Sequence, residues 1–216
     1  MYKYYNNESY FLDVLKNNRL YFSSFRQFND PSEIFCYLKN TDDGKYYVER
    51  NLKDKIKCCC FSSINNNYLL WSHYGKSHRG FCIEFDFNKY IQNKNLVNVN
   101  KFNFNGKELY GFQVDYNPYV LEVSFSKSNK VLVFDQTIEL VRHKYTDWLY
   151  EKEYRLITEL NEPGFIEIPR EAIISITYGF NISNRRMNYL DKRIKSMGFD
   201  IETKKLKLAS NMGLLL

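Results

Sequence analysis

Several features that identify a protein class are missing from this sequence. No stretch approaches the roughly 18 uninterrupted apolar residues of a transmembrane helix, so we expect no membrane partner. The first residues, Met-Tyr-Lys-Tyr-Tyr-Asn-Asn-Glu, lack the apolar core of a signal peptide. The long basic run of a dedicated nucleic-acid-binding arm is absent as well. These absences favour a cytoplasmic protein.

The common nucleotide and metal motifs are also missing. No Gly-x-Gly-x-x-Gly follows a predicted strand, no Gly-Lys-Ser/Thr phosphate loop is present, and no cluster of aspartates suggests two metal ions. This argues against Rossmann enzymes, P-loop enzymes and two-metal nucleases. The five cysteines form no Cys-x-x-Cys pair, and His73, His78 and His143 lack the spacing of a zinc site. We therefore expect neither a disulfide framework nor a structural metal.

The composition is that of a globular protein with an unusual share of aromatic residues. Hydrophobic residues make up 44% and charged residues 26% of the 216 residues, which suits a single domain over residues 1–216. The aromatic share of 18% reflects either codons rich in A and T or a surface on which a ligand stacks. The net charge is +6, and acidic residues are interleaved with the basic ones in most segments, except at Lys204, Lys205 and Lys207. This charge is compatible with an anionic ligand.

The hydrophobic patterns predict an α+β fold. Alternation and β-branched runs predict strands at 2–5, 19–23, 57–62, 80–86, 120–125, 153–158, 172–178 and 201–206, with weaker signals near Phe102 and Val114. Helical spacing and caps predict helices at about 10–17, 134–148 and 184–197, and a helical turn starting at Pro31, while residues 69–74 are either helical or irregular. The order of these elements predicts a mixed or antiparallel central sheet with flanking helices.

The sharpest chemical feature is the pair Glu151-x-Glu153 at a predicted helix-to-strand junction. Spacing by two points both carboxylates to the same side of a sheet. Their repulsion raises the pKa of one of the two glutamates, or else the pair binds a cationic or hydroxyl-bearing ligand. The pair is therefore a candidate catalytic device. Alternatively, both glutamates are solvated and pair with Lys152 or Arg155.

Two other segments carry reactive side chains. Trp71-Ser-His-Tyr74 places an imidazole beside a hydroxyl and a phenol, so His73 is either a general base or orienting donor, or a hydrogen-bonded core residue. No Gly-x-Ser-x-Gly elbow accompanies it, which argues against a serine hydrolase. Cys58–Cys60 contains three thiols that alternate in direction along a strand, and we expect buried thiols there rather than a nucleophile.

The ordered motifs resemble the bacterial family called domain of unknown function 2971, from Tyr2 to about Gly179. The motifs are Tyr2-Lys-Tyr4, Leu20-Tyr-Phe-Ser23, Phe28-Asn-Asp-Pro31, Cys60-Phe-Ser62, Trp71-Ser-His-Tyr74, Gly80-Phe-Cys-Ile-Glu-Phe85 and Trp148-x-x-Glu-x-Glu-Tyr-Arg155. The family usually continues its first motif with arginine, where this chain has Tyr5. Lys3 or Arg19 is then the candidate substitute for that basic group.

The motif order is also similar to that of enzymes that use NAD as an ADP-ribose donor. This similarity implies an ADP-ribosyltransferase-like sheet split in two halves, with NAD as the substrate. Those enzymes place a basic or His residue on a first strand, a Ser-rich motif at a second strand and Glu-x-Glu at a third. The counterparts in this chain are the 2–5 strand, Phe61-Ser-Ser63 and Glu151-x-Glu153. Glu153 would then be the catalytic carboxylate and Glu151 would orient the nucleophile. The implied NAD contacts are Lys3, Tyr4, Tyr21, Ser62, Ser63 and Tyr74.

Three functions follow from these patterns. The leading hypothesis is a domain that transfers ADP-ribose to a nucleic-acid or protein acceptor or hydrolyses NAD, as a toxin or phage-defence effector. The alternatives are a non-catalytic, antitoxin-type module that binds RNA or a protein, and a metal-independent nuclease that uses His73. The enzymatic hypothesis requires both glutamates to face one pocket. With Glu153 as its catalytic carboxylate, this hypothesis fails if the Glu153 side chain is buried in a salt link or points to open water away from any cavity.

Overall fold

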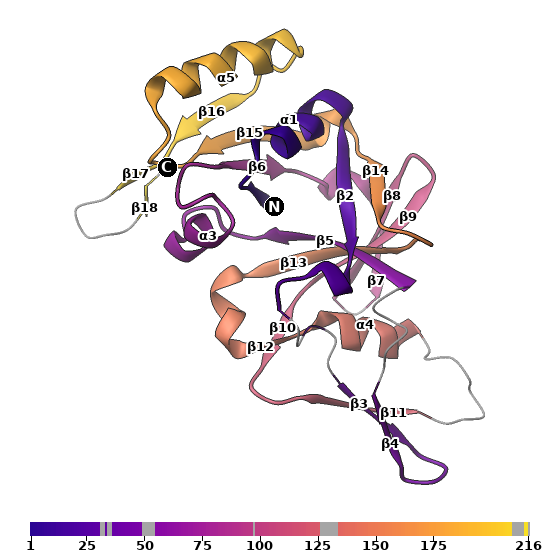
Figure 1. The fold of residues 1–216 in the computed structure, drawn as a ribbon. Coiled ribbons are helices and arrows are strands. Elements are labelled where there is room, and N and C mark those ends of the chain that lie inside the picture. The colour runs from indigo at the N-terminus through magenta and orange to yellow at the C-terminus, as the bar shows by residue number, and fades with distance from the viewer. Residues whose placement is uncertain are drawn as a thin grey trace.

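The protein is built on one long, mostly antiparallel sheet, here described from a computed structural model (Figure 1). The structure describes residues 1–30, 33, 36–48, 55–96, 98–125, 134–208 and 214–215. The helical turn expected at Pro31 lies outside this part of the chain. The architecture is a mixed α+β domain with a curled, mixed sheet and few helices, as the sequence patterns predict.

Nine strands form the main path of the sheet. Their order is β16 (Glu202–Lys205), β15 (Ile173–Tyr178), β6 (Phe81–Phe85), β1 (Tyr2–Tyr5), β5 (Ile56–Ser62), β13 (Glu153–Glu159), β9 (Lys107–Gln113), β8 (Val99–Phe104) and β7 (Ile91–Leu96). All neighbours are antiparallel except β15 and β16, which are parallel. Off this path, β2 (Arg19–Ser24) pairs with both β5 and β14 (Gly164–Glu167).

Smaller sheets and helices surround this path. The small sheets join β10 (Asp115–Asn117) to β12 (His143–Tyr145), β11 (Leu121–Phe125) to β3 (Cys36–Asn40) and β4 (Tyr46–Val48), and β17 (Lys207–Leu208) to β18 (Leu214–Leu215). The α-helices are α1 (Glu8–Asn17), α3 (Tyr68–His73), α4 (Phe134–Arg142) and α5 (Asn184–Ser196). Short 3-10 helices are η1 (Phe25–Gln27), η2 (Asn88–Tyr90), η3 (Thr146–Glu151) and η4 (Arg170–Ala172).

Local sequence explains where the longer helices begin and end. The Asn7 side chain accepts a hydrogen bond from the Ser9 backbone at the start of α1, and Asn18 ends this helix in the left-handed conformation. Ser183 caps α5 in the same way, and Gly198 follows it at a φ of 81°. A left-handed position after a helix favours glycine or asparagine. The predicted ends of both helices are confirmed within two residues.

The two faces of β5 belong to different hydrophobic clusters. Cys58 packs in one cluster with Ile157 of β13, whereas Cys59 packs in the other with Leu156. This alternation follows from the period of two along a strand, as predicted for the three consecutive thiols. No disulfide joins the five cysteines; Cys58 and Cys59 are buried as expected, whereas Cys60 is only half-buried, which corrects the expectation for that thiol.

The sheet opens between β1 and β5. β1 pairs with β6 over four residues but with β5 only where Tyr2 faces Ser62. On this edge of β5, the Lys3 ammonium donates to the Cys60 carbonyl at 3.0 Å. Further along, β2 pairs with β5, and the Ser23 hydroxyl donates to the Cys58 carbonyl at 3.3 Å. The Cys60 carbonyl is thereby satisfied by a side chain, and room remains for a cavity.

The predicted helix over residues 134–148 is corrected by the structure. α4 ends at Arg142, and residues 143–145 instead form β12, which pairs in parallel with β10. Ile138 and Val141 do face the core as the helical spacing predicts. The change at His143 brings Lys144 into a buried cluster of carboxylates, which helical spacing alone does not reveal.

Gly80 packs against the backbone of β1. A methyl group at this position would lie 2.3 Å from the Tyr5 carbonyl oxygen, and Gly75 blocks it on the other side at 2.8 Å. We expect Gly80→Ala to lower the free energy of unfolding by about 1–3 kcal/mol, because backbone atoms must shift. Gly164→Ala is the matched control, since only one atom lies within 4 Å of its added methyl group. Equal urea midpoints for the two variants would contradict this packing.

Candidate functional site

A cavity of about 950 Å³ occupies the opening in the sheet. This volume lies within the usual range of small-molecule sites. Eight of the nine side chains that sequence patterns single out line it: Lys3, Tyr4, Tyr21, Ser62, His73, Tyr74, Glu151 and Glu153. Ser63 is not among the lining residues, since its side chain is exposed and donates to the Lys152 carbonyl. Residues distant in sequence are therefore brought to one surface.

Five separate segments supply these side chains. β1 carries Lys3 and Tyr4, and β2 carries Tyr21. Ser62 ends β5, His73 and Tyr74 lie at the end of α3, and the two glutamates lie on either side of the junction between η3 and β13. The turn between them is tight because Lys152 adopts a left-handed conformation with a φ of 46°. Both carboxylates consequently reach the same cavity.

Lys144 stands at the centre of a buried cluster that sequence patterns did not predict. Its ammonium lies 2.6 Å from a Glu151 oxygen, 2.9 Å from a Glu153 oxygen and 3.2 Å from a Glu33 oxygen. The three N–H donors of the ammonium thus meet three carboxylates. Burial alone would lower the pKa of Lys144, but the three negative charges outweigh burial and raise it. Lys144 is therefore charged.

Arg155 joins the same cluster from β13. Its Nε donates to Glu153 at 2.8 Å, one Nη donates to Glu33 at 2.7 Å, and the other donates to the Val141 carbonyl at 2.7 Å. The Arg155 side chain has no exposed surface. Three carboxylates and two cations leave one excess negative charge in a buried region, which favours uptake of one proton or one cationic group.

Glu153 is an ionised, fully bound carboxylate. Burial would raise its pKa, but Arg155 and Lys144 together hold it well below the ordinary range. One of its oxygens accepts from Arg155 and the other from both Arg155 and Lys144. The predicted pairing of Glu153 with Arg155 is therefore observed, but inside the protein. Because Glu153 lies in a buried salt link, the geometry argues against it as the freely acting carboxylate.

Glu151 has a different environment although it lies two residues away. The Tyr74 hydroxyl donates to one of its oxygens at 2.5 Å and Lys144 to the other at 2.6 Å. A carboxylate can accept about four hydrogen bonds, so about two acceptor positions remain open. Burial, the largest influence, raises the pKa of Glu151, Lys144 opposes this, and Glu153 adds to it. Glu151 is thus the glutamate suited to exchange a proton.

Neighbouring residues hold Glu151 in place. The Ser62 hydroxyl donates to the Glu151 backbone carbonyl at 2.6 Å and accepts from the backbone of Ile64. Burial raises the pKa of the Tyr74 hydroxyl, and the Glu151 charge raises it further, so this phenol remains a donor. Ser62 therefore positions the backbone, and Tyr74 positions the carboxylate.

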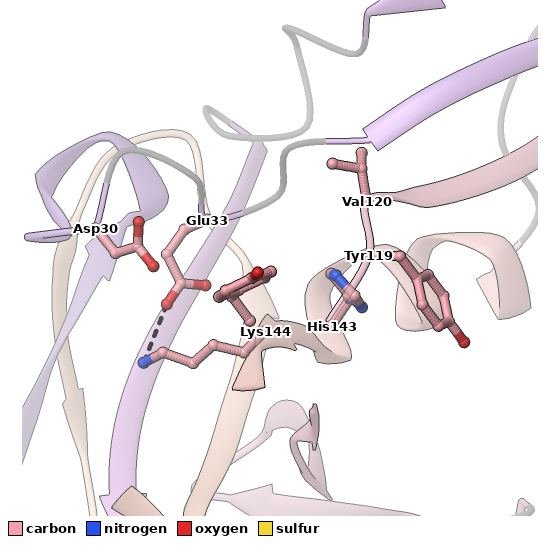
Figure 2. Close-up of a pocket in the computed structure, with 7 residues that line it drawn as sticks. Asp30, Glu33, Tyr119, Val120, His143 and Lys144 are labelled. Carbon is pink, nitrogen blue, oxygen red and sulfur yellow. Dashed lines mark ion pairs between the residues drawn. The ribbon is translucent and has the colours of Figure 1, made fainter. Parts of the chain in front are cut away.

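A second, smaller hollow lies on the other side of Lys144. It has a volume of about 40 Å³ and is lined by Asp30, Glu33, Tyr119, Val120, His143, Lys144 and Tyr145. Figure 2 shows Lys144 reaching across this hollow to the Glu33 carboxylate. Lys144 lines both spaces and so forms part of the wall between them. The small hollow has room for a water molecule, whereas the large cavity can hold a ligand.

Tyr5 lines the large cavity and carries a buried hydroxyl that is unpaired within the described part of the chain. Its side chain is 8% exposed, and its hydroxyl has no hydrogen-bond partner among the described residues. A buried hydroxyl without a partner is destabilising unless a ligand supplies one. Of the two basic residues considered as substitutes for an arginine here, Lys3 lines the cavity, whereas Arg19 is paired with Asp13 at 2.8 Å.

The described residues offer no obvious metal site or membrane span. No group of three or more His, Cys, Asp or Glu side chains in this part of the chain is placed to hold a metal ion. None of its helices has the length and apolarity needed to cross a membrane.

Comparison with known proteins supports the family resemblance. Residues 70–156 match the model of a family described as protein of unknown function (DUF2971). The match includes the last four residues of α3, all of β6, both glutamates and Lys144. No curated protein and no solved structure matches the chain. The description of the matched family states no activity.

Proposed function

We propose that the large cavity binds NAD and that the protein cleaves the bond between nicotinamide and ribose. The ADP-ribose passes either to water or to an acceptor molecule. The observation that carries this proposal is the meeting of Glu151, Glu153, the β1 tyrosines and Ser62 in one cavity of ligand size. A role as toxin or phage-defence effector would follow from depletion of NAD or modification of an acceptor.

The strand order supports an ADP-ribosyltransferase-like arrangement. β1, β5 and β13 are adjacent in the sheet, and Tyr2, Ser62 and Glu153 occupy facing positions on them. The three motifs considered as counterparts of the NAD-dependent enzymes therefore lie side by side. Three unrelated short motifs would not be expected to lie at facing positions on adjacent strands.

The aromatic and charged groups of the cavity suit this substrate. Tyr4, Tyr5, Tyr21 and Tyr74 offer rings and hydroxyls to the nicotinamide and adenine bases and to the riboses. The excess negative charge of the glutamate cluster attracts the positively charged nicotinamide ring. Lys3 is the cation at the β1 side of the cavity and the candidate contact for the diphosphate.

The chemical step assigns different roles to the two glutamates. The bond between the nicotinamide nitrogen and ribose C1′ breaks with its electron pair leaving on nicotinamide, and C1′ develops positive charge. The oxygen of water or of an acceptor hydroxyl then bonds to C1′ and loses its proton to Glu151. The fixed charge of Glu153 lies beside this centre and holds Lys144 and Arg155.

Tyr5 gives a test of ligand binding that separates function from folding. We expect Tyr5→Phe to leave stability unchanged or raise it by about 1 kcal/mol, because an unpaired buried hydroxyl is removed. The same change should weaken NAD binding about two- to tenfold, because a hydrogen bond to the ligand is lost. Calorimetric titration and urea unfolding of the same preparations measure both effects.

Tyr178→Phe is the matched control. Tyr178 is fully buried outside the cavity, and its hydroxyl donates to Asp191 at 2.7 Å. Here we expect the opposite result, a loss of about 1–2 kcal/mol in stability with unchanged NAD affinity. If Tyr5→Phe binds NAD as well as the wild type, the ligand does not reach this hydroxyl.

The function itself is tested by incubating the wild-type protein with NAD and separating the products. Release of nicotinamide, with free ADP-ribose or an ADP-ribosylated acceptor, is the expected result. Absence of both NAD binding and nicotinamide release would refute the proposal. Cleavage of RNA in EDTA that is lost in His73→Ala would instead support the nuclease alternative.

A further inference from the structure

The C-terminal part of the chain carries most of the protein's net charge. Residues 184–208 contain eight lysines and arginines but three acidic residues, a net charge of +5 out of +6 for the whole chain. These residues form α5 and the edge strand β16, at the end of the main sheet (Figure 1). Lys205 links the two elements through a hydrogen bond to Asn184. The positive charge is therefore concentrated on one end of the sheet.

The exposed face of α5 has an aromatic ring at its centre. Tyr189 is 47% exposed, whereas Leu190 and Ile194 bury the opposite side of the helix. Residues three and four positions away from Tyr189 in either direction share its face of a helix. All four of these positions are basic: Arg185, Arg186, Lys192 and Arg193. A single aromatic side chain is thus framed by four cations.

The contacts of these residues leave the face open for a partner. The Arg186 and Arg193 guanidinium groups lie 5.0 and 5.9 Å from the centre of the Tyr189 ring. Both arginines also approach Glu8 of α1. Arg185 and Lys192, on the other side of the ring, are exposed and form no ion pair within the described part of the chain.

We propose that this face of α5 binds single-stranded nucleic acid. Cations spaced on both sides of an exposed ring match phosphates on both sides of an unstacked base. The ring supplies a stacking platform, which an acidic protein surface would not require. The binding is independent of the proposed NAD chemistry. The proposed binding face also lies near the large cavity. Arg186 on this face pairs with Glu8 of α1, and Tyr10 of the same helix lines the cavity and is 67% exposed.

The test measures binding of a labelled single-stranded RNA of about 12 nucleotides by fluorescence anisotropy at several salt concentrations. We expect Tyr189→Ala to weaken binding about five- to 150-fold, the usual effect of losing one stacked base, and Tyr189→Phe to retain it. The double change Arg185→Gln and Lys192→Gln should make the slope of log affinity against log salt shallower by about 1.4.

Matched controls separate this binding from general charge and from catalysis. Lys107→Gln removes an exposed lysine from β9, five strands away from β15 across the sheet, and should leave the affinity nearly unchanged. Glu151→Gln should bind RNA like the wild type. No RNA binding at low salt, or equal binding by Tyr189→Ala and the wild type, would overturn the proposal. Binding of polyglutamate but not of RNA would also overturn it in favour of an acidic protein partner.

Discussion

Lys144→Met is expected to lower the free energy of unfolding by about 3–5 kcal/mol. The substitution keeps a similar side-chain volume but leaves Glu33, Glu151 and Glu153 with Arg155 as the one cation of this buried cluster. Removing one partner from a buried charge network is costly because the remaining charges stay desolvated. Chemical denaturation at pH 7 measures this loss.

The loss should depend on pH in a direction that identifies its cause. Without Lys144, the pKa of Glu151, which burial already raises, rises further above its unfolded value, so this group binds more protons in the folded than in the unfolded state. The stability of the variant should therefore recover as the pH falls from 7 toward about 4.3, the ordinary glutamate pKa. In the wild type, Glu153 has the opposite effect on the pH dependence of stability. Its lowered pKa stabilises the folded state at neutral pH, and this stabilisation is lost as the pH falls through the folded-state pKa of Glu153.

Lys101→Met is the matched control for Lys144→Met. Lys101 pairs with Glu108 at 2.5 Å, but the two side chains are 29% and 53% exposed. A surface pair of this kind contributes about 0–1 kcal/mol, so the control should unfold close to the wild type. Similar losses in the two variants would mean that the cluster around Lys144 is not a buried charge network.

Glu151→Gln is expected to reduce kcat for nicotinamide release by about 10²–10⁴-fold. The amide keeps the size of the side chain and can still accept from Tyr74, but it cannot take a proton from the attacking oxygen. NAD binding should change much less than kcat, because the cavity remains intact. Single-turnover measurements with calorimetric binding data separate these two effects.

The pH profile gives a second signature of Glu151. A base must be deprotonated, and burial raises the pKa of Glu151 above its ordinary value. In the wild type, kcat/KM should therefore fall as the pH drops through this raised pKa, and this limb should disappear in Glu151→Gln. Glu139→Gln on α4, where the glutamate is exposed, is the control and should match the wild type. A wild-type rate for Glu151→Gln would remove this residue from the mechanism.

The sequence predicts the parts of the site that depend on local patterns. Both glutamates do reach one cavity, but through the left-handed turn at Lys152 and not through strand alternation, because Glu151 belongs to η3. Alternation along 153–158 correctly predicts the strand. The β1 strand is also correct, and the segment around Trp71, predicted to be helical or irregular, is helical. These features follow from side-chain direction and propensity, which neighbouring residues determine.

The charge network could not be predicted in the same way. Glu33 and Arg155 lie 122 residues apart, and no local pattern relates them. Lys144 falls inside a helical pattern that ends at Arg142 because the chain then pairs with β10. The contrast between a tightly bound Glu153 and a more available Glu151 depends on Lys144 and Arg155. The similarity to NAD-dependent enzymes implied a catalytic role for Glu153, which is the glutamate that the structure holds most tightly.

The most direct test is a crystal structure of the protein soaked with NAD or a non-hydrolysable analogue. The proposed function predicts the nicotinamide riboside in the large cavity, with a ligand oxygen or the attacking water about 2.6–3.2 Å from the Glu151 carboxylate. It also predicts a ligand contact to the Tyr5 hydroxyl. NAD bound elsewhere, or a Glu151 that contacts only Tyr74 and Lys144 while NAD occupies the cavity, would contradict it.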